Sequence, residues 1–261
     1  AQRALAELKK EPTHVEKLKQ VCCKFRVCPF EIACMLARGA KVIIADYYHM
    51  LQPGIRDTLL KRMGKQLEDC IIIMDEGHNL PSRARKLLTQ SMSTFVLENA
   101  IKEAGMVEYP ETAKHLAELK KKVEGFGSML PLEKHEMLLP KSKLVAEVEN
   151  IVNYEELCGS LRFIAEEVIE VKKKSFANSV ANFLELWRGP DKSFVRILSR
   201  VFGKSKPYIN IAYKCLDPSL AVKDIIESAH SIIVMSGTLT PSEMYRDLLG
   251  FPEETQCAEY D

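Results

Sequence analysis

Short apolar runs that end in polar residues are the most regular pattern along this chain of 261 residues. Such runs cover residues 41–46, 70–74 and 231–235, and a weaker one covers 208–213. Continuous apolar runs of about four to eight residues are typical of strands buried on both faces of a parallel sheet. We therefore predict four strands, of which 41–46, 70–74 and 231–235 are buried.

Helical patterns separate these runs. Thr13 with Glu16 forms a predicted capping box at one helix start, and Thr240 is the predicted N-cap of another helix. Strands that alternate with helices indicate a parallel α/β sheet. The predicted helices cover residues 2–10, 13–25, 28–38, 55–63, 81–90, 217–229 and 241–250.

The pattern changes across residues 93–210, where strand signals almost vanish and long helical periodicities follow one another. Residues 193–202 fit a strand or a helix, and their alternation favours a strand. Trp187 is predicted to lie in the core of this segment. The fold class is therefore α/β, with a parallel-sheet domain interrupted by a mostly helical insertion. Its helices are predicted at 95–104, 111–124, 143–151, 154–173 and 176–187.

Composition limits the classes of function. Charged residues make up 28% of the chain, apolar residues 46%, and the net charge is +1, so any polyanion site must be a local patch. No apolar run reaches the length of a membrane span, and we predict no membrane contact. Eight cysteines are too few for a disulfide scaffold. Four of them, which we expect to be buried thiols, are Cys70, Cys158, Cys215 and Cys257.

The strongest candidate site follows the run at 70–74. Asp75 and Glu76 are adjacent acids, followed closely by His78 and Asn79. Ligands of open α/β sheets bind beyond the carboxyl ends of the strands. One carboxylate there suits Mg²⁺, and the other can orient a water for attack on a γ-phosphate. The alternative is a solvated turn, which the buried strand disfavours.

A second candidate follows the run at 231–235. Ser236, Gly237 and Thr238 place small hydroxyl residues at a predicted strand end, where they could bond to the acidic motif and sense its state. Taken alone, the segment is better explained as a turn before a capped helix. The presence of Asp75 and Glu76 makes a coupling role more attractive.

Cysteines and basic residues give weaker signals. Cys28 precedes a proline, as the last ligand of several iron–sulfur patterns does. With Cys22, Cys23 and Cys34 nearby, spacing alone favours a partial or lost cluster site. The runs at 120–122 and 172–174 are better explained as solvated lysine faces. Better candidates for single-stranded nucleic acid, because cations alternate with aromatic rings, are Lys24 and Arg26 around Phe25, and the stretch 204–208.

Together these motifs resemble the XPD group of superfamily 2 DNA helicases. The resemblance implies a RecA-like motor domain that uses ATP and Mg²⁺, with Asp75 as the magnesium acid and Glu76 as the water-activating acid. It implies that His78 couples hydrolysis to motion with Ser236 and Thr238. The residues that carry the resemblance are 28–30, 42–51, 73–81 and 234–241.

The same resemblance implies a domain plan. Residues 1–38 would be the C-terminal part of a 4Fe–4S cluster domain in which Cys28 is a ligand. Residues 39–92 and 211–261 would be parts of the first motor domain, and 93–210 a helical arch. Single-stranded DNA and repair-complex proteins, the latter through the arch, are the implied partners. The implied location is nuclear in a eukaryote, and cytoplasmic and nucleoid-associated in an archaeon or bacterium.

Departures from the family pattern limit what the chain can do by itself. The Gly-Lys-Thr phosphate loop of the family does not occur in these residues, and Gly77 stands where the family usually has alanine. We expect a fragment of a 5′-to-3′ DNA repair helicase that is inactive in isolation. The alternative is a non-catalytic module that binds single-stranded DNA or a protein.

Overall fold

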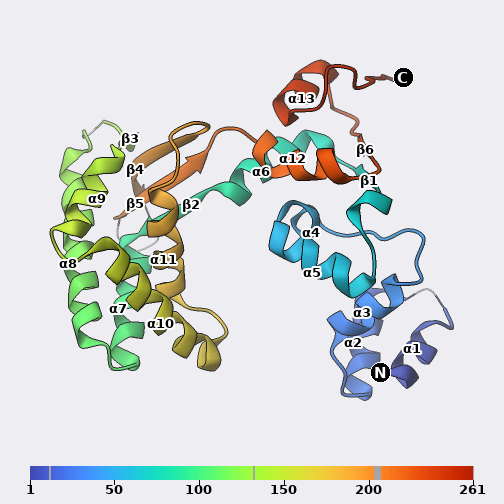
Figure 1. Cartoon of the computed structure of the whole chain (residues 1–261), viewed down its shortest axis with the longest axis horizontal. Helices are drawn as coiled ribbons and strands as arrows, with labels where there is room; N and C mark the ends of the chain where they lie inside the picture. Colours follow the sequence, from blue (N-terminus) through green and yellow to red (C-terminus); the bar gives the residue numbers. More distant parts are fainter. Residues whose placement is uncertain (12, 132, 203–206, 261) are drawn as a thin grey trace. The chain divides into compact units, whose positions relative to one another are not determined.

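The fold is taken from a computed structural model, which describes residues 1–11, 13–131, 133–202 and 207–260. The chain divides into two compact units (Figure 1). The first unit joins residues 1–87 with 218–261, and the second unit is the intervening segment 88–217. Each unit has its own hydrophobic core and is described by itself.

The first unit begins with three helices: α1 (Gln2–Leu8), α2 (Val15–Lys24) and α3 (Pro29–Ala37). Their small shared core includes Cys22 and Ile32, both almost fully buried. Because apolar positions on short amphipathic helices need a partner, the three helices bury them against one another.

Further helices of the first unit pack around a second core that includes Leu51 and Met74. No helix in the described part of the chain is long and apolar enough to cross a membrane. Besides two 3₁₀ turns at Leu67–Asp69 and Gly77–Asn79, the elements are α4 (Tyr47–Leu51), α5 (Pro53–Met63), α6 (Leu80–Leu88), α12 (Ser219–Ser228) and α13 (Ser242–Leu249).

Two parallel strands, β1 (Ile71–Met74) and β6 (Ser231–Val234), lie side by side in the first unit (Figure 1). Their register pairs Ile71 with Ser231 and Met74 with Val234. Both strands were predicted from their apolar runs. Because the strands are parallel and in register, their carboxyl ends lie at the same edge.

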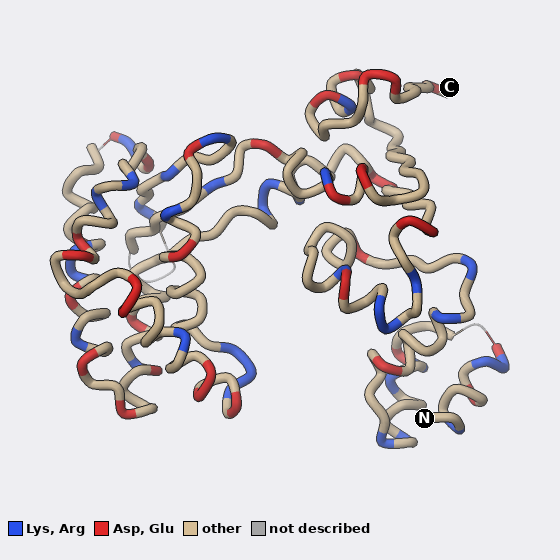
Figure 2. Tube along the Cα trace, in the orientation of Figure 1, with Lys and Arg blue, Asp and Glu red and all other residues tan. Residues whose placement is uncertain are grey.

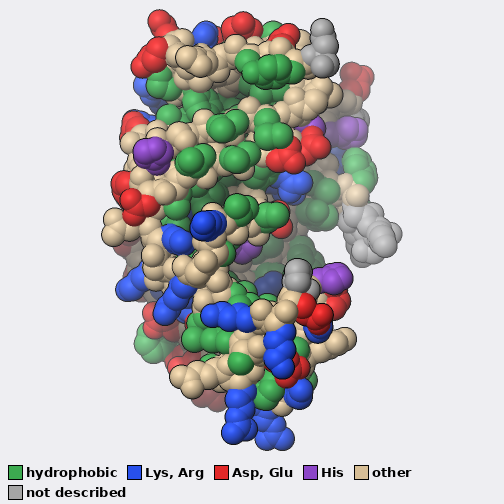
Figure 3. All heavy atoms as spheres, turned by 90° about the vertical axis from the view of Figure 1, so that its right-hand side faces the viewer, with side chains coloured by type: hydrophobic (Ala, Val, Ile, Leu, Met, Phe, Trp, Pro, Cys, Tyr) green, Lys and Arg blue, Asp and Glu red, His purple; other side chains and the backbone are tan. Residues whose placement is uncertain are grey.

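The burial predicted for these runs is wrong in part. Residues 41–46 form no strand, and the side chains of Val42 and Ile44 are 79% and 96% exposed. In β1, Ile71 and Ile73 are 61% and 60% exposed, whereas Met74 is buried. Within the described residues the sheet of the first unit has two strands, so an apolar run lacks covering layers on both faces. Figure 3, which views the first unit, shows many hydrophobic side chains at the surface.

The second unit combines helices with a sheet, and its core includes Trp187, which is fully buried as predicted. Helices α7 and α8 pack on each other, as do α10 and α11. The helices are α7 (Thr94–Met106), α8 (Pro110–Phe126), α9 (Lys141–Glu149), α10 (Tyr154–Lys172) and α11 (Phe176–Trp187), with a 3₁₀ turn at Gly127–Met129.

The sheet of this unit has the antiparallel order β2 (Gln90–Ser93), β5 (Pro207–Cys215), β4 (Phe194–Phe202), β3 (Glu136–Leu138). The strand preferred for residues 193–202 is confirmed. The strand predicted at 208–213 is β5, but it lies in this antiparallel sheet and not in the predicted parallel one, and β2 and β3 were not predicted. Strands as short as β2 and β3 contain too few residues to show an alternating pattern.

Two predicted helix caps are also wrong. The N-cap of α2 is His14, and the hydroxyl of Thr13 donates instead to the Glu11 carbonyl, 2.9 Å away. The N-cap of α13 is Pro241 rather than Thr240. Gly250 ends α13 in a left-handed conformation with φ 74°, which a glycine adopts without strain.

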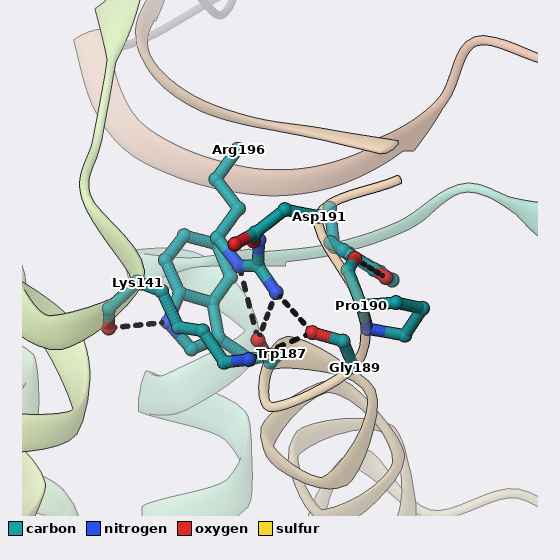
Figure 4. Close-up of polar contacts among 7 residues, drawn as sticks. Lys141, Trp187, Gly189, Pro190, Asp191 and Arg196 are labelled. Atoms are coloured by element: carbon teal, nitrogen blue, oxygen red, sulfur yellow. Dashed lines mark hydrogen bonds and ion pairs between the residues drawn. The ribbon is translucent and has the colours of Figure 1, made fainter. Parts of the chain in front are cut away.

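Arg196 of β4 links the sheet of the second unit to the end of α11 (Figure 4). Its guanidinium donates to the Trp187 carbonyl at 2.7 Å and the Gly189 carbonyl at 2.8 Å, and it pairs with Asp191. The side chain is buried, and its charge lies over the rings of Trp187 and Tyr213. A buried arginine with carbonyl acceptors at a helix end satisfies groups that the helix leaves unpaired.

Candidate functional site

The candidate site lies at the common edge where β1 and β6 end. The Met235 amide donates to the Met74 carbonyl at 3.0 Å, and the Gly77 amide donates to the Met235 carbonyl at 2.9 Å. These two bonds extend the pairing of the strands into the segments that follow them. The acidic segment 75–79 and the hydroxyl segment 236–238 are thereby held next to each other.

The two acids emerge into solvent on a tight backbone turn. Glu76 has φ 53°, a left-handed conformation that a residue with a side chain rarely adopts. Asp75 Oδ1 accepts a hydrogen bond from the Glu76 amide at 2.9 Å, and the Tyr47 hydroxyl donates to the Asp75 carbonyl. Both carboxylates are exposed. Exposed carboxylate oxygens suit Mg²⁺, which retains several water ligands when bound to proteins.

Tyr47 was not predicted as part of the site. It begins α4, directly after the exposed run 41–46, and its hydroxyl reaches the backbone of the acidic turn. Burial raises the pKa of the Tyr47 hydroxyl, and the negative charge of Asp75 raises it further. The neutral hydroxyl is therefore a stable donor to the Asp75 carbonyl. The sequence showed only that an aromatic residue follows an apolar run.

Gly77 lies where β6 comes very close. A Cβ on this residue would be 2.3 Å from Val234 Cγ1 and 3.3 Å from the Met235 carbonyl oxygen. Glycine is therefore required by the close approach of the two segments in this arrangement. The alanine of the family pattern would need the Val234 side chain to move.

His78 connects the acidic and hydroxyl segments. Its Nδ1 lies 2.6 Å from Ser236 Oγ and 3.3 Å from a carboxylate oxygen of Glu76. Its Nε2 lies 2.9 Å from the side-chain nitrogen of Asn79. Ser236 Oγ in turn accepts from the Thr238 amide at 3.2 Å. The structure thus brings together the predicted residues His78, Glu76, Ser236 and Thr238, and adds Asn79.

The cysteines near the N-terminus do not form a complete metal site. Cys28 is exposed at the start of α3, Cys23 is exposed, and Cys22 and Cys34 are buried. Burial raises the pKa of the Cys22 and Cys34 thiols, and the nearby Cys28 adds to both shifts. Iron–sulfur clusters need thiolates, which a raised pKa disfavours. In the ranges that the structure describes, no three His, Cys, Asp or Glu side chains are grouped to hold a metal ion.

Of the four remaining cysteines, all predicted to be buried, two are buried and a third is partly buried. Cys158 and Cys215 are buried, and Cys70 is partly buried, but Cys257 is exposed, so its predicted burial is wrong. Burial is the main cause that raises the pKa of Cys158 to about 11. A thiol with such a pKa is unreactive at neutral pH.

The basic candidates are spread over both units. Lys24 Nζ lies 3.0 Å from a Glu7 carboxylate oxygen and 5.1 Å from the centre of the Phe25 ring. The backbone of Arg26 is in the left-handed region, with φ 51°. The stretch 204–208 lies partly outside the described residues.

The lysine run 120–122 on α8 behaves as a solvated face. Lys120 pairs with Glu98 and Glu124, and Lys122 pairs with Glu147. Figure 2 shows basic and acidic residues interspersed along the helices of the second unit. Charges of both signs on one surface leave a weaker net field for a polyanion.

Comparisons with known proteins find DNA helicases among the proteins that are similar to this chain. The DEAD_2 family model matches residues 1–97. The Saccharomyces cerevisiae "General transcription and DNA repair factor IIH helicase subunit XPD/RAD3" is 24% identical over 90% of this chain. The "ATP-dependent DNA helicase CHL1" of Meyerozyma guilliermondii is 24% identical over 88% of it. The alignments cover 38% and 30% of those relatives, so the chain spans less than two fifths of their length.

Solved structures show a similar fold. A chain titled "XPD_Helicase" aligns with a TM-score of 0.59 and 21% identity over 91% of this chain and 39% of its own length. A second, titled "XPD_APO", aligns with a TM-score of 0.55 and 21% identity over 78% of this chain and 37% of its own length. The α/β class, with a parallel pair of strands and many helices, is confirmed by these likenesses.

Proposed function

We propose that this chain belongs to the XPD family of superfamily 2 helicases and is the central part of an ATP-driven 5′-to-3′ DNA helicase that acts in DNA repair. One observation carries the proposal most directly. The parallel pairing of β1 and β6 holds the acidic segment and the hydroxyl segment within hydrogen-bond distance. An acidic motif for hydrolysis and a neighbouring segment that responds to it are what a nucleotide-driven motor needs.

In this proposal the acidic turn works on ATP in the full-length helicase. A magnesium ion bound with ATP neutralises charge on the phosphates. Asp75 would hold that ion, and the Tyr47 hydroxyl steadies the backbone of Asp75. Glu76 orients the attacking water and accepts its proton. The exposure of both carboxylates leaves them accessible to a nucleotide.

The hydroxyl segment transmits the state of the acidic turn. His78 is within reach of both Glu76 and Ser236, so a movement of the Glu76 carboxylate changes what His78 can bond to. Ser236 is also bonded to the backbone of Thr238. A change at the phosphate is therefore passed to the segment between β6 and α13.

The two units would have separate tasks. The first unit would be part of the motor domain, and the second unit, residues 88–217, would be the arch that guides single-stranded DNA and contacts repair-complex proteins, so that β5 lies wholly in the arch and not partly in the motor domain. Lys24 and Arg26 would contact DNA from residues 1–38. For this last segment, Cys28 as one ligand of a 4Fe–4S cluster remains a prediction, because among the described residues its neighbours do not complete a four-thiolate site. The helicase would be nuclear in a eukaryote.

The direct test is Glu76→Gln in the full-length helicase. Glutamine keeps the shape of the side chain but cannot accept a proton, so ATP turnover should fall by at least about a hundredfold. DNA binding should be unchanged. The matched control is Glu68→Gln, which neutralises an exposed glutamate of the same unit outside the site. Turnover that persists in Glu76→Gln would refute the assignment of the acidic turn.

A non-catalytic binding module is the second candidate. The observation in its favour is that the second unit has a core of its own, separate from the acidic turn. In that case residues 1–261 should bind a single-stranded oligonucleotide with an affinity that falls steeply with salt. Fluorescence anisotropy at two salt concentrations measures this. The absence of any binding would remove DNA from the partners of the chain alone.

A further inference from the structure

We propose that Asn79 is a positioning residue that fixes the tautomer of His78 and so sets the direction of the hydrogen-bond chain from the acidic turn to the hydroxyl segment. The inference deepens the proposed function and rests on it for its mechanistic meaning. No role was predicted for Asn79 beyond its place in the motif. Its side chain faces the nitrogen of His78 that points away from Ser236.

The first argument comes from the Nε2 side of the ring. The side-chain nitrogen of Asn79 lies 2.9 Å from His78 Nε2. An amide nitrogen can only donate, so Nε2 has to be the acceptor and carries no proton. In the neutral ring the proton is then on Nδ1.

The second argument comes from the Nδ1 side and does not depend on Asn79. A Glu76 carboxylate oxygen lies 3.3 Å from Nδ1, and Ser236 Oγ lies 2.6 Å from it. An ionised carboxylate can only accept, so a bare Nδ1 would face it with one lone pair against another. A proton on Nδ1 removes that repulsion. Both sides of the ring therefore favour the same tautomer.

The direction of the remaining bonds follows. With Nδ1 as donor, Ser236 Oγ accepts from His78 and also from the Thr238 amide at 3.2 Å. The acceptor capacity of this hydroxyl is then filled, so its own proton points elsewhere, and Thr238 Oγ1 lies 3.4 Å away. The side-chain donors therefore run from Asn79 through His78 to Ser236, and the Thr238 amide donates to the same Ser236 oxygen from the other side.

The backbone of Asn79 is held in the position that this role needs. Its amide donates to the Glu76 carbonyl at 3.0 Å, and its own carbonyl accepts from the Ser82 hydroxyl at 2.9 Å. The residue is thus fixed between the acidic turn and the start of α6. A fixed backbone lets a short side chain orient the neighbouring ring with little loss of entropy.

The test measures the tautomer directly in ¹⁵N-labelled residues 1–261, from two-bond ¹H–¹⁵N correlations of the imidazole rings at mildly alkaline pH. His78 is assigned by the loss of its signals in His78→Gln. We expect a protonated Nδ1 and a bare Nε2, the opposite of the preference of a free histidine side chain. A protonated Nε2 in the unmodified chain would overturn the proposal without any variant at Asn79.

Variants at Asn79 test its own part. Asn79→Leu has a similar volume but no donor, so the ring should shift toward the form with Nε2 protonated. Asn79→Asp places an acceptor beside Nε2 and should shift it in the same direction. The control Ser82→Ala removes a bond to the backbone of Asn79 and should leave the tautomer unchanged. If the ring keeps its tautomer in both Asn79 variants, the role proposed for Asn79 is refuted, and Glu76 and Ser236 fix the tautomer of His78 without it.

The consequence for coupling is measured in the full-length helicase. Asn79→Leu should lower the stimulation of ATP turnover by DNA by about tenfold, a loss typical of a missing orienting partner, while KM for ATP changes little. Unchanged stimulation together with a shifted tautomer would refute the coupling role. If the unmodified helicase hydrolyses no ATP, the proposed function is refuted. The tautomer of His78 is measured independently of ATP hydrolysis, so that result still tests the role of Asn79.

Discussion

At the scale of single residues, Gly77 shows how little space the site leaves. A Cβ there would be 2.3 Å from Val234 Cγ1, well inside normal contact distance. We predict that Gly77→Ala lowers the stability of the first unit by about 1–3 kcal/mol, because the buried turn has to shift to relieve the overlap. Hydrogen exchange at the Gly77 and Met235 amides, whose bonds join the two segments, measures the effect.

Two further variants separate the overlap from other effects of the added methyl group. In Gly77→Ala with Val234→Ala the opposing methyl groups are absent, so part of the loss should be recovered as a coupling energy. Gly54→Ala, where a Cβ would meet nothing within 4 Å, should not destabilise the chain. Equal losses in the single and double variants would mean that contact with Val234 is not the cause.

At the scale of elements, Arg196 holds the end of α11 on β4 and β5. Arg196→Lys keeps the charge but cannot reach the carbonyls of Trp187 and Gly189 together. We predict that Arg196→Lys lowers the free energy of unfolding by about 2–4 kcal/mol, because buried carbonyl acceptors are left unpaired. Urea unfolding followed by the fluorescence of Trp187, the sole tryptophan, reports on this unit.

The comparison for this prediction is Arg188→Lys. Arg188 pairs with Glu155, and its side chain is 48% exposed. An exposed pair contributes little, so this variant should lose less than about 1 kcal/mol. If the two variants lost the same free energy of unfolding, the burial of Arg196 would not explain its contribution to stability.

The elements also show why the sequence predicted some features and not others. Helices and the strands β1, β4, β5 and β6 were found because their periodicity or apolar run lies within the segment itself. The short strands β2 and β3 exist because of their neighbours β5 and β4, which no local pattern reveals. Conversely, the apolar run 41–46 forms no strand, since no described strand pairs with it.

The same reasoning applies to the candidate site. The sequence indicated which residue types follow β1 and β6, and parallel pairing was enough to bring them to one edge. The contacts of Tyr47 and Asn79 depend on the direction of side chains after a left-handed turn at Glu76. That conformation is not encoded in a simple residue pattern, because glutamate rarely adopts it.

At the scale of the whole molecule, the two ends of the second unit lie close to each other within that unit. Gln90 of β2 pairs with Tyr213 of β5, and Thr89 Oγ1 accepts from the Cys215 amide at 3.1 Å. An inserted unit whose two ends are close can fold without the domain that carries it. Its core is also continuous within residues 88–217.

We therefore predict that residues 88–217 alone fold to a stable unit with Trp187 buried. The peptide should unfold in one cooperative urea transition, because helices and sheet share one core. Arg196→Lys should cost the isolated unit the same free energy as the whole chain, since all partners of Arg196 lie inside it. A non-cooperative transition or an exposed tryptophan spectrum would show that the first unit is needed for folding. Loss of stability in both contexts by different amounts would instead reveal energetic coupling between the units.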